Sequence, residues 1–151
     1  MVIIIGAPII DMNAFENQGK YLIMDMGSKG AAEFKQKYKN AIFIYVIPPT
    51  KERLLSQMGT RGLERFERSK RQLHQVTDIY DWLIINNDVN TAVQEIEKIM
   101  HTVKEYSHNL DAIDIDTMKF LYDRNFHNKK NIDFLNKFYG EEEPCLPLCE
   151  F

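Results

Sequence analysis

One stretch of the sequence opens in the way a phosphate-binding loop usually does. The apolar run Val2–Ile5 is followed by Gly6–Pro8, with the sequence Gly-Ala-Pro. Such a loop needs a second glycine, a lysine and a Ser or Thr at fixed positions, because backbone N–H groups and the lysine hold the phosphates and the hydroxyl holds Mg²⁺. Asp11–Asn13, with the sequence Asp-Met-Asn, stands there instead. A carboxylate repels a triphosphate, so the sequence favours a strand-to-helix turn without phosphate, with a nucleotide site at Gly6 as the alternative.

A second group of candidate residues is basic. The segment Arg61–Arg71 contains five basic and two acidic side chains, a local charge of +3. Arg61, Arg65 and Arg68 fall partly on one side of a helix if that helix begins early. This face could bind a phosphate, an acidic peptide or the chain's own acidic residues, although a charged run on a helix is commonly only a solvated face.

Polar residues also stand directly after apolar runs, at Asp25 and at Asn86–Asp88. Asp and Asn are common after strands for turn and capping reasons alone. They gain interest only if the strands that precede them end at the same edge of one sheet.

The elements that would position these residues are short apolar runs separated by helical patterns. Continuously apolar runs, typical of parallel strands buried on both faces, occur at Val2–Ile5, Tyr21–Met24, Ala41–Ile47 and Trp82–Ile85. Apolar residues at helical spacing follow them: Ala31, Phe34 and Tyr38; Leu54, Leu55 and Met58; Phe66, Leu73 and Val76; and Val93, Ile96, Met100 and Val103. This alternation predicts an α/β fold: a three-layer, open, mainly parallel sheet with flanking helices. Ligands then bind beyond the carboxyl ends of the strands.

The composition changes near residue 105. Residues 1–104 carry 14 basic and 12 acidic side chains, and residues 105–151 carry 5 and 10. Two further helical patterns follow, with Met118, Leu121 and Tyr122 in one and Ile132, Leu135 and Phe138 in the other. We therefore predict a core of residues 1–104 and a C-terminal helical extension of residues 105–151 packed on it, ending in a frayed acidic tail at 141–144.

The overall composition excludes several classes of protein. The net charge of −3 gives no electrostatic reason to expect a nucleic-acid partner or a membrane surface. No apolar run approaches the roughly 18 residues of a membrane span, and the first residues do not read as a signal peptide. Two cysteines, Cys145 and Cys149, provide neither a structural disulfide framework nor a metal site, and the four histidines have no ligand spacing. We expect no metal site and a cytoplasmic protein.

Four segments in register resemble the guanylate kinase family. Residues 17–31, NQGKYLIMDMGSKGA, are similar to the family's QGK segment and the strand and turn after it, and residues 41–50, AIFIYVIPPT, are similar to its strand ending in Pro-Pro-Ser. Arg61-Gly62 occupies the place of an Arg-Gly pair, and residues 80–88, YDWLIINND, resemble a strand ending in Asn-Asp-Asp. The resemblance covers residues 14–104 and implies the fold of P-loop NTPases and nucleoside monophosphate kinases.

The resemblance assigns roles to individual residues. Arg61 would contact the transferring phosphates, which suits the planar fork of a guanidinium. Arg71 stands one position before the lid-helix arginine of the family, whose place Gln72 takes, so Arg71 could substitute for it only if the helix turned. Asp25 would lie near the guanine or a Mg²⁺-bound water, and Asn86 on the adenine side of the nucleotide.

Other family features have no counterpart. Only about ten residues separate Gly6 from Gln18, where the family places its P-loop helix and the small domain that grips GMP. The second acidic residue of the Asp25 segment is Gly27 here. The resemblance is therefore to a guanylate kinase core without its substrate-gripping half.

Three functions fit this pattern. The chain is a guanylate-kinase-like domain without kinase activity that serves as a binding or scaffolding module, with a protein partner at Arg61–Arg71 and no required cofactor. Alternatively it is an active guanylate kinase, using ATP and Mg²⁺ to phosphorylate GMP, whose missing half is supplied elsewhere. The third is a nucleotide sensor that retains Asp25, Arg61 and Asn86 without turnover. We favour the first, because losing the phosphate cradle, its lysine and its metal-binding hydroxyl together removes phosphoryl transfer.

Overall fold

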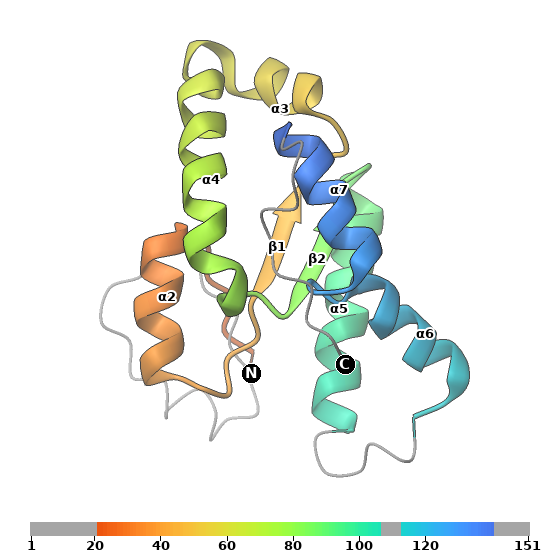
Figure 1. Ribbon diagram of the computed structural model, residues 1–151. Coiled ribbons are helices and arrows are strands. Elements are labelled where there is room, and N and C mark those ends of the chain that lie inside the picture. Colours follow the sequence, from red (N-terminus) through yellow and green to blue (C-terminus); the bar gives the residue numbers. More distant parts are fainter. Residues whose placement is uncertain (1–20, 107–112, 141–151) are drawn as a thin grey trace.

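The computed structural model describes residues 21–106 and 113–140, and for residues 73–77 it describes the backbone alone. The predicted strand Val2–Ile5, Gly6, the acidic tail and both cysteines lie outside the described residues. The fold is a mixed α/β arrangement in which helices surround two parallel strands (Figure 1).

The two strands are β1 (Ile44–Ile47) and β2 (Trp82–Ile85), paired in parallel with Ile44 opposite Trp82 and Ile47 opposite Ile85. The sequence predicted β2 with these bounds, whereas β1 begins three residues later than predicted. Residues 21–24, predicted as a strand, contain only isolated bridge residues at Leu22 and Met24. Parallel strands need a crossover, and here α3 (Lys51–Met58), the 3₁₀ turn η1 (Gly59–Arg61), α4 (Gly62–Val76) and the 3₁₀ turn η2 (Thr77–Ile79) provide it.

Alternate residues of the strands face two separate apolar clusters, as the pleat requires. Ile42, Ile44, Trp82 and Ile84 join the cluster covered by α5 (Val89–Glu105), with Ala92 and Ile99 buried in it. On the other face, Phe43, Ile47 and Leu83 join a larger cluster that takes in α2 (Ser28–Lys37), α4 and α7 (Lys129–Tyr139). Helices therefore cover both faces of the sheet.

The helical extension is tied to the start of β2 through Asp81. The amide of Phe126 donates to the Asp81 carbonyl (3.0 Å), and Trp82 forms an antiparallel bridge with Asn125. Asp81 Oδ2 accepts the amide of Phe43 (2.9 Å), and Asp81 Oδ1 pairs with Lys35 Nζ (3.2 Å). One aspartate therefore joins α2, the approach to β1, and the turn between α6 (Ile115–Arg124) and α7.

The helix α7 contributes Ile132, Leu135, Phe138 and Tyr139 to the core, so the predicted face of this helix is confirmed. Asn128 caps its beginning by accepting the amide of Asn131 (2.8 Å). Gly140 ends it with a φ of 72°, a left-handed conformation that glycine adopts without a steric penalty. The boundary between a core of residues 1–104 and an extension stays a prediction.

Two predicted apolar faces are wrong in detail. Met118 and Tyr122 are 51% and 67% exposed, because α6 packs Phe120 against the cluster under α5 instead. Leu121, which was predicted for the same face, is half-buried. Val93 of α5 is likewise 47% exposed, while Ile99 and Met100 are buried. Among the described residues, no helix combines the length and hydropathy needed to cross a membrane.

Candidate functional site

The carboxyl ends of the two strands meet at one edge of the sheet. The amide of Asn86, the residue after β2, donates to the carbonyl of Ile47, the last residue of β1 (2.8 Å). The loop at 48–50 and the loop at 86–88 therefore lie side by side. Figure 1 shows α3 and the beginning of α4 beyond this end of β1. This is the edge at which open α/β sheets bind their ligands.

The helix α3 is fixed to this edge by two contacts. Thr50 caps it, because the Thr50 hydroxyl accepts the amide of Arg53 (3.2 Å). Arg53 Nη1 in turn donates to the carbonyl of Asn87 (2.7 Å). Sequence reasoning missed Arg53. Its signal was a guanidinium one turn into the helix that follows Pro48-Pro49, but only the fold places it across from Asn87.

Asn86 has a side-chain acceptor without a donor. Its Oδ1 atom is buried and has no hydrogen-bond partner, and an unpaired buried acceptor is costly. Asp88 is already occupied, because its carboxylate caps α5 by accepting the amide of Thr91 (2.9 Å), and the hydrogen bonds with Thr91 lower the pKa of Asp88 below its usual value. Of the polar residues after β2, Asn86 thus has free capacity toward a ligand.

The basic segment begins with η1, which runs directly into α4 at Gly62. The helical path therefore starts before Arg61, as the grouping of Arg61, Arg65 and Arg68 on one side requires, and all three are exposed. Arg68 pairs with Glu64 across one turn (2.8 Å), a surface pair of small energetic value. Within residues 21–106 and 113–140, Arg61 and Arg65 have no carboxylate partner.

Arg61 and Arg71 do not converge in this structure. Ten residues of helix separate them by about 15 Å along the axis and about 80° around it. Arg71 is exposed, whereas Gln72 is half-buried, so the two positions face different surroundings. One phosphate cannot contact both arginines here, and the roles of both stay predictions.

Asp25 is exposed and lies three residues before α2. The N-cap of α2 is Gly27, and no side chain caps this helix. Asp25 therefore does not serve as its cap, which removes one structural explanation for this carboxylate. Gly6, the remaining predicted binding residue, lies outside the described part of the chain.

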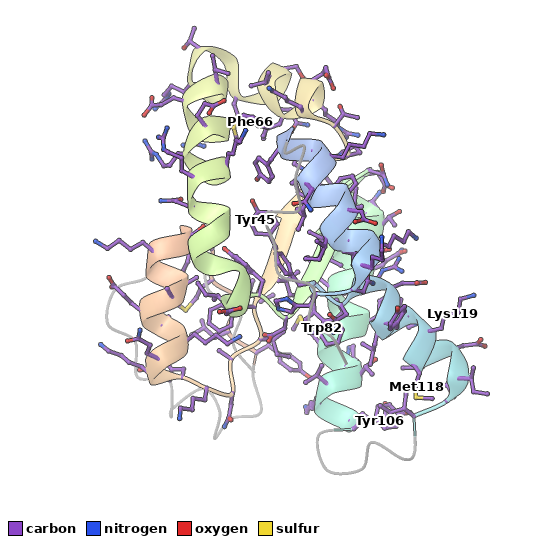
Figure 2. The ribbon with its side chains drawn as sticks, viewed as in Figure 1. Tyr45, Phe66, Trp82, Tyr106, Met118 and Lys119 are labelled. Atoms are coloured by element: carbon purple, nitrogen blue, oxygen red, sulfur yellow. The ribbon has the colours of Figure 1, made fainter. Side chains whose placement is uncertain are left out.

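A buried cluster of tyrosine hydroxyls was not predicted from the sequence. The hydroxyls of Tyr45 on β1 and Tyr139 on α7 are 2.6 Å apart and form a hydrogen bond. The centre of the Tyr80 ring lies 4.9 Å from the centre of the Tyr45 ring. Burial raises the pKa of all three tyrosines above the ordinary value. The hydroxyls therefore stay protonated at neutral pH, and the hydrogen bond between Tyr45 and Tyr139 links β1 to α7. Figure 2 shows Tyr45 in the middle of the molecule, between α4 and α7.

The described residues contain no cluster of three or more His, Cys, Asp or Glu side chains that could hold a metal ion. The polar groups at the sheet edge are instead amides, a guanidinium and backbone carbonyls. Such a set suits the recognition of an anion or of a base edge.

Comparison with known proteins gives one family. The profile of the family described as guanylate kinase matches residues 6–103. The guanylate kinase of Clostridium tetani is 29% identical over 106 residues, covering 66% of this chain and 50% of that protein. That of Thermotoga maritima is 31% identical over 106 residues, covering 65% and 51%, and that of Lactococcus lactis is 23% identical over 125 residues, covering 73% and 60%. The chain spans about half the length of the curated relatives it matches.

Proposed function

Because this chain belongs to the guanylate kinase family, we propose that it is a guanylate-kinase-like domain without phosphoryl transfer of its own, which acts as a binding or nucleotide-sensing module. The observation that carries this proposal is the sequence after Gly6–Pro8. Asp11–Asn13 stands where a phosphate-binding loop needs its lysine and its hydroxyl.

The physical reason lies in the reaction. Phosphoryl transfer depends almost entirely on positioning and on neutralising the charge of the phosphates. Without the lysine, the backbone cradle and the hydroxyl that holds Mg²⁺, the reacting phosphates are neither held nor neutralised. A chain in this state retains the scaffold of the family and loses its chemistry, so it requires neither ATP nor Mg²⁺.

We propose that the complete fold is the three-layer, open, mainly parallel sheet of P-loop proteins. The parallel pairing of β1 and β2, with helices on both faces, supports this assignment. The ligand would then lie at the edge formed by the loops after the two strands. Asn86 would accept a hydrogen bond from the ligand, and Arg61 would approach an anionic group from α4. We also infer a cytoplasmic location.

The ligand of the basic face is an acidic group, either a nucleotide phosphate or the carboxylates of a protein partner. Exposed Arg61 and Arg65, without carboxylate partners in the described residues, support an anionic ligand. Arg61→Ala is therefore expected to lower the affinity for GMP or for Mg·ATP at least severalfold in isothermal titration. Lys130→Ala, a change of an equally exposed cation on α7, serves as the matched control.

The titration distinguishes a nucleotide sensor from a protein-binding scaffold. Nucleotide binding that depends on Arg61 but not on Lys130 identifies a nucleotide sensor. An absence of heat with both nucleotides leaves a scaffold for an acidic peptide, which a glutamate-rich peptide library tests directly. Nucleotide binding that is equal in both variants contradicts a role for the Arg61 side chain.

The second candidate is an active guanylate kinase, converting ATP and GMP to ADP and GDP with Mg²⁺. The order and register of the matched segments, with Asp25, Arg61 and Asn86 retained, favour it. It requires another polypeptide to supply the phosphate cradle and the GMP-gripping domain. Turnover that appears only when such a polypeptide is added would support this candidate.

A further inference from the structure

The end of α7 lies against the beginning of α4. The ring of Phe66, a fully buried residue of α4, has its centre 5.3 Å from that of Tyr139 and 6.1 Å from that of Phe138. Figure 2 shows Phe66 between α4 and this end of α7. The helix α7 ends at Gly140, whose left-handed conformation turns the chain away from the helix axis. The chain therefore leaves the described structure beside the first turns of α4.

The ring of Phe66 also holds a cation. Lys51 Nζ, from the first residue of α3, lies 4.2 Å from the centre of this ring, within the range of a cation–π contact. Lys51 is half-buried, and it has no carboxylate partner in the part of the chain that the structure describes. A charge that is partly removed from water gains more from an opposite charge than an exposed one does. Lys51 is therefore able to accept a carboxylate, and it shares an aromatic neighbour with the end of α7.

Arg65 extends this positive charge. It directly precedes Phe66, is exposed, and has no carboxylate partner among the described residues. Arg61 stands four residues earlier, so it shares one side of α4 with Arg65. We call Lys51, Arg61 and Arg65 the basic corner. The glutamates of α3 and α4 form no ion pair with this corner, so its positive charge is not balanced by its own helices.

Residues 141–143, three glutamates in a row, follow Gly140 directly. They lie outside the described residues, and no other place in the sequence has even two acidic residues side by side. Three residues of extended chain span about 10 Å. Because Lys51 and Tyr139 contact the same ring, the segment is long enough to reach the basic corner. A tethered group acts as if it were present at about millimolar concentration, which favours this segment over an acidic group on another molecule.

We propose that residues 141–143 fold back onto Lys51 and Arg65 and act as an internal ligand of the basic corner. Their carboxylates supply the opposite charge that the described residues do not provide. The regulation that follows rests on the proposed function, in which Arg61 approaches an anionic ligand. Because Arg61 and Arg65 share one side of α4, the segment competes with that ligand. The contact is therefore autoinhibitory, since an external anion binds only those molecules in which the segment has left the corner.

Carbodiimide cross-linking of the full chain tests the contact itself, because this reagent joins a lysine amine to a carboxylate that touches it. In an equal mixture of normal and isotope-labelled chains, mass spectrometry should find Lys51 linked to residues 141–143 within one chain. Lys137 is the comparison, because it is exposed on α7 and stands nearer to the segment in the sequence. Links to Lys137 without links to Lys51, links between chains alone, or no links at all would overturn the proposal.

Arg65→Gln removes one of the two cations that hold the segment. The yield of the Lys51 cross-link should therefore fall by at least about twofold, a modest effect typical of an exposed ion pair. Lys130→Gln removes an exposed cation near the beginning of α7 and should leave this yield unchanged. Circular dichroism verifies that each variant is folded. Equal yields in the two variants would contradict the proposed contact with Arg65.

Removing the three carboxylates tests the regulation, in the triple variant Glu141→Gln, Glu142→Gln and Glu143→Gln. Isothermal titration with GMP, and separately with a hexaglutamate peptide, measures its affinity for an external anion. At least one of these probes should bind the variant at least about threefold more tightly than it binds the wild type, because the fraction of open molecules rises.

A matched control removes the same charge from α6 and α7, in the triple variant Asp116→Asn, Asp123→Asn and Asp133→Asn. It leaves the segment in place, so the affinity should stay near that of the wild type. Equal gains in both triple variants would assign the effect to net charge and overturn the autoinhibition. If neither probe binds any form of the chain, the proposed anion binding fails and the autoinhibition with it, whereas the Lys51 cross-link still decides the contact.

Discussion

At the scale of single residues, Asp81 has the largest structural role of the charged side chains described above. Its two carboxylate oxygens hold Phe43 and Lys35, and its carbonyl holds Phe126. The residue therefore connects three parts of the chain that are distant in sequence. Asp81 stabilises the fold through these hydrogen bonds and not through burial, since its side chain is 38% exposed.

Replacing Asp81 with Ala should lower the free energy of unfolding by about 1–3 kcal/mol, because the amide of Phe43 loses its acceptor. Urea denaturation, followed by the fluorescence of Trp82 on the neighbouring strand, measures this loss. Asp78→Ala, which removes an exposed carboxylate three residues away, should change stability by less than about 0.5 kcal/mol. Equal losses in both variants would show that Asp81 acts through charge alone.

The buried tyrosines make stability depend on alkaline pH. Burial raises the pKa of Tyr45 and Tyr139 in the folded chain, whereas the unfolded chain loses these protons near pH 10. Their contribution to stability is therefore complete below about pH 10 and is lost above it, by about 1.4 kcal/mol per pH unit for each tyrosine.

Replacing Tyr139 with Phe removes one of these groups, so the decline of stability with rising pH should become less steep. Urea titrations at a series of pH values, with tyrosinate absorbance as a second signal, measure the slope. Tyr122→Phe, at a position that is 67% exposed, should keep the slope of the wild type. An unchanged slope in Tyr139→Phe would contradict the account of this cluster.

At the scale of elements, α7 is part of the core and not an appendage. Leu135 is fully buried, and the ring centres of Phe66 on α4 and Tyr139 lie 5.3 Å apart in a tilted arrangement. Leu135→Ala should therefore cost about 2–5 kcal/mol, and Trp82 fluorescence and helical circular dichroism should change in one transition. Lys137→Ala, on the exposed side of the same helix, is the control. Loss of helix signal before any change at Trp82 would instead indicate an independently folding extension.

The element types could be predicted from the sequence better than their faces. Trp82–Ile85 is a run of apolar residues bounded by polar ones, and the strand has those bounds. The helix α6 has apolar residues on both sides, so periodicity alone could not decide between Met118 and Phe120 as the inward residue. The position of α5 decides it, and that position is a property of the tertiary structure.

Some contacts of the candidate site could likewise be predicted from the sequence, and others could not. The meeting of Asn86 with the end of β1 follows from parallel pairing, which the sequence predicted. The contact of Tyr45 with Tyr139 joins residues 94 positions apart, and no local pattern indicates it. The side of α4 on which Arg61 lies depends on the 3₁₀ turn η1. The spacing of apolar residues does not predict that this turn forms.

At the scale of the whole molecule, the chain joins a family core to surfaces of its own. Residues 6–103 match the guanylate kinase family, while α6 and α7 lie after that match. The first 104 residues carry a small positive excess and the remainder a negative one. This division is consistent with a family scaffold whose core is completed by a later helix, α7.

Whether this chain transfers phosphate is tested most directly by the release of ADP from Mg·ATP in the presence of GMP, measured on the 151-residue chain with a coupled assay. An authentic guanylate kinase at the same concentration provides the positive control, and omission of GMP gives the background. We expect the chain to release no ADP above background, whatever affinity it has for either nucleotide. GMP-dependent turnover by the chain alone, abolished by Arg61→Ala, would mean that this site transfers phosphate without a phosphate-binding loop, and would contradict the proposal.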